Sequence, residues 1–285
     1  MRGEMLLYGG MCVLAVALFT LVHMEVRMRE EVLRVVFLDV GQGDAIFIES
    51  PSGAQMLIDG GKDQSVLREL SAVMPWWDRS IDVVMATHPD ADHVGGLFEV
   101  LSRYTVFTAL HPGVNHDTPY TESLFEAFAR EKNSGMREVL ARRGQVISLG
   151  DGVRVEILFP DRDVSGVETN TASVVARVVY GDTALMLTGD APRAIEEYLA
   201  SLDRDMLSAD VLKAGHHGSD TSSSPLFVGF VAPTHVVFSR GCDNSYGHPH
   251  PDTRATMERF GIRTYDTCTE GRVVFESDGT QILAK

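Results

Sequence analysis

The chain has 285 residues, enough to bury a sizeable core as one large domain or two small ones. Its hydrophobic content of 44% and charged content of 23% are ordinary for a globular protein. The formal net charge of −15 argues against non-specific nucleic-acid binding through a basic surface, although bound metal ions can still supply positive charge locally. Cys12, Cys242 and Cys268 predict neither a metal-binding pair nor a disulfide framework, so they do not indicate a redox compartment.

The N-terminal segment is strongly apolar. The range from Met5 to Met24 contains no Asp, Glu, Lys or Arg, and about twenty apolar residues are enough to cross a bilayer as a helix. We predict an uncleaved membrane anchor within residues 1–30. A cleaved signal peptide is one alternative, but no small-residue cleavage site follows the apolar run; a buried soluble helix is the other. One arginine precedes the span and several follow it, which weakly favours a cytoplasmic domain.

The remaining chain, residues 31–285, alternates between strand and helix patterns and contains no evident linker, so it is predicted to form one domain. Period-two and short apolar runs predict strands, and spacing of three and four predicts helices. Strands are expected at 33–39, 45–49, 55–59, 81–85, near 106, 145–149, 153–159, 172–180, 183–188 and up to His216. Helices are expected at 63–74, 94–102, 120–143 and 192–201, with two strand–helix units closing the chain. The pattern favours two packed sheets with helices outside.

The most informative motif follows the expected strand at 81–85. Within six residues it contains two histidines and two aspartates, His88, Asp90, Asp92 and His93. Imidazole nitrogen and carboxylate oxygen are the ligands that Zn²⁺ and Mn²⁺ take in proteins. An exposed polar turn is the alternative, but four ligand-type residues directly after a buried strand favour a metal site.

Further polar clusters follow other expected strands. Asp190 can cap the following helix or bridge two metal ions, and its position alone does not decide between these roles. His216 and His217 are adjacent, and neighbouring residues of an extended chain point to opposite sides, so one of the pair is expected to face the site. The stretch 244–251, with two His-Pro pairs, is either a surface turn or a further source of ligands.

Seven motifs, taken in order, resemble those of the metallo-β-lactamase superfamily, and more narrowly the C-terminal metallo-β-lactamase-like domain of ComEC-type DNA-uptake (competence) proteins. The resemblance covers about residues 33–284 and implies an αββα sandwich, of the α+β class, with a metal site at one sheet edge. The motifs are 37–45 (FLDVGQGDA), 57–61 (LIDGG), 88–96 (HPDADHVGG), 170–173 (NTAS), 187–190 (LTGD), 212–219 (LKAGHHGS) and 244–249 (NSYGHP).

The chain departs from the general superfamily pattern in two places. Asp90 takes the second histidine position of H-x-H-x-D-H, a change that ComEC-like domains share, and the separate downstream histidine has no match, Asn170 or Ser173 lying nearest in order. The site is therefore richer in oxygen, which favours Mn²⁺ or Mg²⁺, with Zn²⁺ as the alternative. The chain also lacks the multi-span channel of such proteins, so it either acts with a separate channel protein or has another role.

The resemblance implies a site for two divalent metal ions, which activate a water and clamp the reacting oxygens. His88 and Asp90 would hold one ion, Asp92 and His93 the other, and Asp190 would bridge them. His216 is expected as a further ligand, with His248 as the competing candidate.

Other residues receive supporting roles. The residues expected to take part in catalysis are Asp92, Asp190, His217, His248 and Lys213, of which the last three would aid the leaving oxygen. Ser219 and Asn244 would hold a phosphate oxygen. Residues expected to orient the ligands from behind are Asp39, Gln42, Asp44, Asp59, Asn170 and Ser173.

Three functions fit these residues. The first is a membrane-anchored, metal-dependent phosphodiesterase or nuclease that acts on DNA during uptake or processing. The second is a hydrolase of a small ester, thioester, lactone or nucleotide, and the third is a non-enzymatic membrane component with a structural metal site. A basic groove at the site would favour the first and a closed apolar pocket the second. By resemblance to ComEC-like domains, which face outward, the domain is expected outside the cytoplasm, against the weak charge bias.

Overall fold

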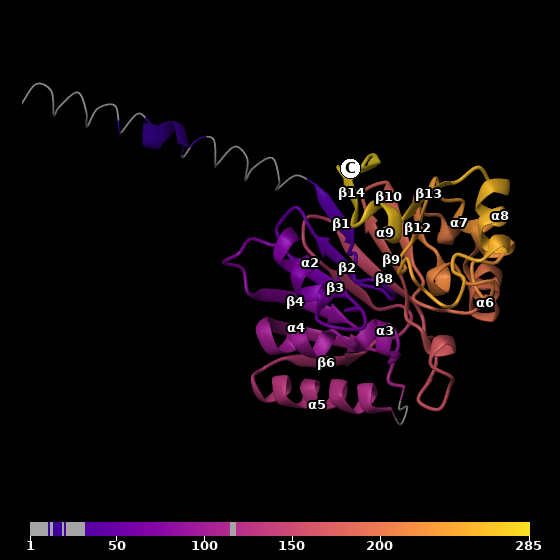
Figure 1. Cartoon of the computed structure of the whole chain (residues 1–285), viewed down its shortest axis with the longest axis horizontal. Helices are drawn as coiled ribbons and strands as arrows, with labels where there is room; N and C mark the ends of the chain where they lie inside the picture. The colour runs from indigo at the N-terminus through magenta and orange to yellow at the C-terminus, as the bar shows by residue number, and fades with distance from the viewer. Residues whose placement is uncertain (1–10, 12–13, 19, 21–31, 115–117) are drawn as a thin grey trace, which may run out of the picture.

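The protein folds into two β-sheets packed face to face, with helices on both outer surfaces (Figure 1). The computed structural model describes residues 11, 14–18, 20, 32–114 and 118–285. This arrangement is the predicted αββα sandwich. No helix of the described part is long and apolar enough to cross a membrane. Most of the predicted anchor, residues 5–24, lies outside the described residues.

The first sheet has eight strands, and its middle is built from the N-terminal third of the chain. Residues alternate across it. In β1 (Leu33–Phe37), Val36 packs under the outer helices, whereas Val35 and Phe37 face the other sheet. The strand order is β15 (Ile282–Ala284), β14 (Val273–Ser277), β1 (Leu33–Phe37), β2 (Ile46–Glu49), β3 (Gln55–Ile58), β4 (Ser80–Met85), β5 (Thr105–His111) and β6 (Arg137–Leu140).

The second sheet has seven strands and contributes the other half of the inter-sheet core. Val155, Val178 and Leu185 pack in the same cluster as Val35 and Phe37 of the first sheet. The strand order is β13 (Arg263–Asp266), β12 (His235–Phe238), β11 (Val211–Lys213), β10 (Thr183–Leu187), β9 (Val175–Tyr180), β8 (Arg154–Phe159) and β7 (Val146–Ser148).

Each sheet carries its own layer of helices. Apolar side chains of the first layer, such as Leu70, Leu97 and Phe128, pack on the first sheet, and Leu199 and Phe227 pack on the second. The first layer is α2 (Ser65–Val73), α3 (Ala91–Val94), α4 (Leu97–Arg103) and α5 (Pro119–Asn133). The second half of the chain supplies α6 (Arg193–Asp203), α7 (Pro225–Val231), α8 (Pro251–Arg259) and α9 (Thr267–Glu270).

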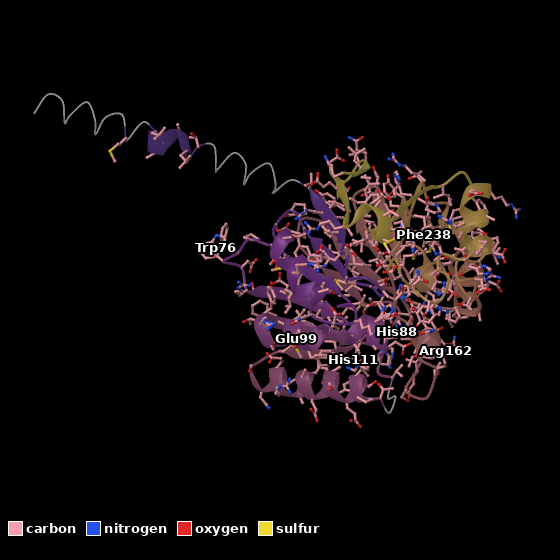
Figure 2. All side chains as sticks on the ribbon, in the orientation of Figure 1. Trp76, His88, Glu99, His111, Arg162 and Phe238 are labelled. Atoms are coloured by element: carbon pink, nitrogen blue, oxygen red, sulfur yellow. A yellow bond between two sulfur atoms is a disulfide. The ribbon has the colours of Figure 1, made fainter. Side chains whose placement is uncertain are left out.

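The topology brings polar loops from both sheets to one place. Strands β3 to β6 are parallel to one another, as are β10 to β13. In such sheets the loops at the carboxyl ends of the strands form the usual ligand-binding crevice. His88, in the loop after β4, lies at the junction of the two halves in Figure 2.

Several predicted elements have different bounds in the structure. The helix expected at 120–143 is wrong beyond residue 133: α5 stops there, Gly135 adopts φ 105°, and β6 then adds an edge strand parallel to β5. A left-handed glycine is a common way for a helix to end. The helix expected at 94–102 is two short helices, because the chain turns at Gly95 and Gly96.

The C-terminal region and the cysteines also differ from expectation. The predicted closing strand–helix units are wrong at the very end, where β14 and β15 form an antiparallel hairpin on the first sheet. The expectation of no disulfide is wrong as well, because Cys242 and Cys268 are joined by one. Their separation of 26 residues gave no recognisable spacing motif, but the turn after β12 and helix α9 lie together in the fold.

Candidate metal centre

Asp59 is a buried aspartate that contacts His93 of the predicted metal motif. Asp59 directly follows β3, and its Oδ2 lies 2.8 Å from Nδ1 of His93. The same carboxylate accepts hydrogen bonds from the Thr87 backbone N–H at 2.8 Å and from the Thr87 hydroxyl at 2.7 Å. A carboxylate on Nδ1 fixes the ring and leaves Nε2 free for a metal ion. Asp59 therefore occupies the orienting position that the sequence predicts for it.

Four ligand atoms from both halves of the protein converge on one point. His217 Nε2 lies 3.3 Å from His93 Nε2, 3.3 Å from Asp92 Oδ2 and 3.3 Å from Asp190 Oδ2. His93 Nε2 also lies 3.3 Å from Asp190 Oδ2. Donor atoms about 2.0–2.1 Å from a tetrahedral ion lie about 3.3 Å apart. His93, His217 and Asp190 therefore fit a divalent metal ion in both chemistry and spacing. Asp44 completes with them a buried group of four whose ligand atoms all lie within 4.8 Å of one another, and Asp92 lies beside this group.

A lysine lies beneath this cluster. Lys213 at the end of β11 is fully buried, and its ammonium donates to Gly189 O at 2.8 Å. It also lies 2.5 Å from Asp44 Oδ2 and 3.3 Å from Asp190 Oδ1. The three contacts match the three N–H donors of an ammonium. All three N–H donors of the Lys213 ammonium thus have acceptors within the protein, and the side chain is closed to solvent. This favours a positioning role over the predicted contact with a leaving oxygen.

The charges of the cluster support one another. Burial alone would raise the pKa of Asp44, but Lys213 and His217 lower it to about 2. Burial would also raise the pKa of Asp190, but the positive charges of His217, His93 and Lys213 hold it well below its ordinary value. Burial would lower the pKa of His93, but Asp190 and Asp59 raise it well above the usual range. Asp44 and Asp190 therefore stay ionised, as carboxylate metal ligands must be.

His88 and Asp90 form a second group of donors beside the first. His88 is fully buried, its Nδ1 lies 3.0 Å from the Thr87 hydroxyl, and its Nε2 has no hydrogen-bond partner among the described residues. Asp90 Oδ2 is 3.8 Å from that nitrogen. Burial and the neighbouring His93 hold the pKa of His88 well below its ordinary value, so the ring is neutral. A buried neutral imidazole with a free nitrogen is suited to a second metal ion.

The two adjacent histidines do not point to opposite sides as the extended-chain argument predicts. His216 and His217 have φ values of 49° and 55°, in the left-handed region. In this tight turn both rings reach Asp190 Oδ2. Nε2 of the partly exposed His216 lies 3.6 Å from this oxygen, and Nε2 of the buried His217 lies 3.3 Å from it. The geometry places His217, rather than the predicted His216, among the inner donors.

The loop after β12 closes over the rim of the site. Asn244 uses its side chain to hold this loop, since its Oδ1 accepts from His248 N at 2.9 Å and its Nδ2 donates to His248 O at 3.0 Å. The His248 ring lies 5.8 Å from that of His216 and stacks on Tyr246 at 5.6 Å. Burial and the nearby histidines lower the pKa of His248 to about 4, so it is neutral near pH 7.

The remaining predicted residues lie around the loops. Ser173 Oγ accepts from Asp190 N at 3.2 Å and so positions that aspartate. Asn170 begins the short 3-10 helix that ends just before Ser173, and its buried Oδ1 has no hydrogen-bond partner in the described part. Gln42 Oε1 accepts from Gly241 N at 3.2 Å, and Asp39 Oδ1 accepts weakly from Gly41 N at 3.4 Å. Both act on loop shape.

Ser219 lies in the loop that follows the two histidines. Its side chain is buried, and its hydroxyl lies 2.9 Å from that of Thr221 within the loop. The Thr221 hydroxyl in turn lies 3.1 Å from Nδ1 of His216. Ser219 therefore supports the histidine loop from within, and this geometry does not favour the predicted contact with a phosphate oxygen.

An open hollow of about 290 Å³ lies against Asp92. Its lining includes Lys62, Asn244 and Tyr246. Neither Lys62 nor Tyr246 was singled out from the sequence. The available signal for Lys62 was its place after the LIDGG strand end, at the same sheet edge as Asp59.

A two-sheet sandwich with histidines and aspartates gathered at the shared sheet edge is the architecture of a metal-dependent hydrolase. The chain belongs to the metallo-β-lactamase superfamily, whose family model matches residues 38–235. The predicted family resemblance is therefore confirmed.

Competence proteins are among the relatives of this chain. It is 28% identical over 263 residues to ComE operon protein 3 of Bacillus subtilis, covering 85% of this chain and 32% of that protein. It is 30% identical over 245 residues to competence protein ComA of Neisseria gonorrhoeae, again covering 85% of this chain and 32% of the relative. The chain thus spans about a third of the length of these ComEC-like proteins.

A solved structure shows the same fold at low sequence identity. Igni18, a metallo hydrolase from the archaeon Ignicoccus hospitalis, superposes with a TM-score of 0.55 at 16% identity, covering 86% of this chain and 98% of that one. At this identity the match supports the fold alone.

Proposed function

We propose that this protein is a divalent-metal-dependent phosphodiesterase that cleaves DNA strands. The observation that carries the proposal is the oxygen-rich donor set of His93, His217, Asp92 and Asp190 beside an open polar hollow. The relatives named for competence support DNA as the substrate. A closed apolar pocket would instead have favoured a small ester, and the hollow beside Asp92 is lined by lysine, asparagine and carboxylate groups.

The residues of the site fall into metal ligands and residues that position those ligands. Bound divalent ions would supply an activated water and positive charge for the phosphate oxygens, with His93, Asp92, His217 and Asp190 as the inner ligands. Asp59, 2.8 Å from Nδ1 of His93, would favour the tautomer that ligates through Nε2. Lys213 keeps Asp190 ionised and fixed. His88, Asp90 and His216 would be the candidate ligands of a second ion, with Asp190 beside His216.

The test is hydrolysis by the full chain of single-stranded DNA and of bis-p-nitrophenyl phosphate, each with Mn²⁺, Mg²⁺ or Zn²⁺. Metal-dependent cleavage of both substrates that is lost in Asp92→Ala is the expected result. Cleavage of the small diester alone would redirect the proposal to a nucleotide or small-molecule hydrolase. An absence of turnover with metal still bound would contradict the proposed phosphodiesterase.

We also propose that the domain lies outside the cytoplasm, carried by an N-terminal anchor. The support from the described residues is the Cys242–Cys268 disulfide, because stable disulfides form chiefly in oxidising compartments. A membrane-impermeant thiol reagent applied to intact cells after impermeant reduction would label both cysteines of an external domain. Labelling only after lysis would contradict this orientation.

A further inference from the structure

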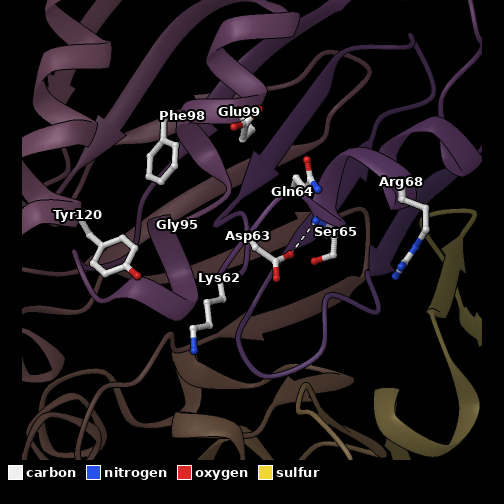
Figure 3. Close-up of a pocket in the computed structure, with 9 residues that line it drawn as sticks. All are labelled: Lys62, Asp63, Gln64, Ser65, Arg68, Gly95, Phe98, Glu99 and Tyr120. Atoms are coloured by element: carbon white, nitrogen blue, oxygen red, sulfur yellow. Dashed lines mark hydrogen bonds between the residues drawn. The ribbon is translucent and has the colours of Figure 1, made fainter.

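Two hollows meet at one lysine. The first, of about 290 Å³, contains Asp92 of the metal cluster, and the second, of about 600 Å³, lies between α2, α4 and the start of α5. Lys62 lines both. The second hollow is drawn in Figure 3, where Tyr120 and Lys62 lie toward one end and Arg68 toward the other. A chain-like substrate bound at Asp92 can therefore extend past Lys62 into the second hollow.

The loop that carries Lys62 is fastened to the metal motif itself. Gly60 N donates to His93 O at 2.7 Å, and Gly61 N donates to Asp44 O at 2.7 Å. A side chain at Gly95 would place its Cβ 2.1 Å from Lys62 O, so α3 and this loop are in direct contact. These contacts fix the position of Lys62 relative to the metal cluster, as a contact to a neighbouring phosphate requires.

The charge of the second hollow is more positive than its composition suggests. One of its two carboxylates is paired with a cation, since Glu99 Oε2 lies 3.0 Å from Arg103 Nη1. The other, Asp63, accepts from Ser65 N at 2.8 Å and keeps its negative charge. Lys62 has no ion pair or hydrogen bond from its side chain within the described part of the chain. Arg68, whose side chain is 69% exposed, donates to Asp39 O at 3.2 Å and lies 3.4 Å from Glu69, whose carboxylate also binds Arg272 at 3.0 Å. Lys62 and Arg68 together outweigh the Asp63 carboxylate, so the charge that lines the hollow has a positive excess.

Two aromatic rings complete the hollow. Phe98 of α4 is half-buried, and Tyr120 of α5 is 37% exposed. Exposed rings beside free cations form the usual surface for single-stranded nucleic acid, where bases stack on the rings and phosphates bind the cations. Paired double helix offers no free base faces to such rings.

We propose that the hollow lined by Lys62 and Tyr120 is a binding site for the single strand that flanks the bond to be cut. Lys62 binds the phosphate next to the metal cluster, and Tyr120 stacks a base further along. This inference rests on the proposed nuclease function and adds the strandedness of the substrate and the path of the strand.

The experiment measures binding of a fluorescein-labelled twelve-nucleotide thymidine strand to the full chain by anisotropy, in EDTA so that no cleavage occurs. Lys62→Ala is expected to weaken binding and to reduce the slope of log affinity against log salt by about 0.7, the loss of one phosphate contact on a single strand. Tyr120→Ala is expected to weaken binding about tenfold, the loss of one stacked base, without changing that slope.

Matched controls separate these effects from misfolding. Tyr120→Phe keeps the ring and should bind like the wild type. Lys285→Ala and Trp77→Ala remove an exposed lysine and an exposed aromatic ring elsewhere and should leave binding unchanged. Wild-type affinity in Lys62→Ala and Tyr120→Ala, or no binding by the wild type, would overturn the proposal. Hydrolysis of bis-p-nitrophenyl phosphate tests the proposed nuclease activity separately. If the protein hydrolyses the diester but both variants bind the strand like the wild type, only the binding site proposed here is refuted. If the strand binds as expected but the diester is not hydrolysed, only the proposed activity is refuted.

Discussion

Asp59 combines an unusual backbone with a supporting role for a metal ligand. Its φ is 58°, a left-handed value that aspartate and asparagine tolerate better than most residues. Asp59→Asn therefore keeps the backbone but puts an amide donor against Nδ1 of His93, which favours the tautomer that cannot ligate through Nε2. We expect metal affinity to fall about 10–100-fold, measured by calorimetric titration with Zn²⁺. Asp151→Asn, at another left-handed but exposed position (φ 46°), should bind metal like the wild type; equal loss in both variants would contradict the orienting role.

Glu196 of α6 is expected to make the free energy of unfolding depend on pH. It is buried, and its two oxygens accept from Ser223 N and Ser224 N, each at 2.7 Å. Burial raises its pKa from 4.5 to about 7. A raised acid pKa means that the folded state retains a proton that the unfolded state releases, so stability falls as the pH rises from about 4.5 to about 7.

We expect the unfolding free energy of the wild type, relative to Glu196→Gln, to fall by on the order of 3 kcal/mol between pH 4.5 and pH 8. Urea denaturation across this range measures it. Glu197→Gln, its exposed neighbour on the same helix, should run parallel to the wild type. A difference between wild type and Glu196→Gln that does not vary with pH would refute the assignment.

At the residue scale, the sequence predicts the part of the site that depends on spacing alone. His88, Asp92 and His93 follow a strand in one short run, so their convergence could be anticipated. The inner position of His217 could not be anticipated, because it depends on two consecutive residues in the left-handed region, and no local sequence pattern predicts that conformation. Lys213 lies in the same motif, yet only the packed structure shows that its ammonium is enclosed by protein acceptors.

The contact between α3 and the Lys62 loop gives a prediction at the level of elements. An added Cβ at Gly95 would meet Lys62 O at 2.1 Å and Ala91 O at 2.5 Å. Both are backbone atoms, so Gly95→Ala must move the loop away from the helix. We expect a loss of about 1–3 kcal/mol in unfolding free energy, together with weaker metal binding.

Gly229 in α7 is the matched control. Its nearest neighbour to an added Cβ is Phe260 Cζ at 3.7 Å, an ordinary contact. Gly229→Ala should therefore stabilise the protein by about 0.5–1 kcal/mol through the lower backbone entropy of alanine. Urea denaturation of both variants provides the measurement, and a destabilisation of similar size in each would mean that the close approach at Gly95 has no special cost.

Elements with a clear periodic pattern were predictable, and errors arose where tertiary contacts decide. The charged stretch 120–143 suits a helix locally, but its last part becomes β6 because β5 offers an unpaired edge. The closing hairpin of β14 and β15 depends on β1, more than 230 residues earlier in the chain, through the pairing of Phe37 with Val273. Pairing partners so distant in sequence leave no local signal.

At the scale of the whole molecule, the metal cluster joins the two sheets. His93 and Asp92 come from the first half of the chain, and Asp190 and His217 from the second. Polar bonds between the two halves also cross near this point, such as Ser239 Oγ to Gly43 O at 2.9 Å and Gly241 N to Gln42 Oε1. Without an ion, Lys213 and the two charged histidines must offset several buried carboxylates in a chain that already carries a net charge of −15.

A bound ion should therefore stabilise the entire fold and not a single loop. At a free metal concentration of about one hundred times Kd, the unfolding free energy should rise by about 2.7 kcal/mol, and EDTA should reverse the gain. Thermal unfolding followed both by circular dichroism and by tryptophan fluorescence measures it, with the two probes moving together because the ion links both sheets. His93→Ala should lose the metal-dependent rise while Asp151→Asn retains it. A shift seen by only one probe would mean that the ion holds one half of the sandwich alone, and the inter-sheet role of the cluster would be wrong.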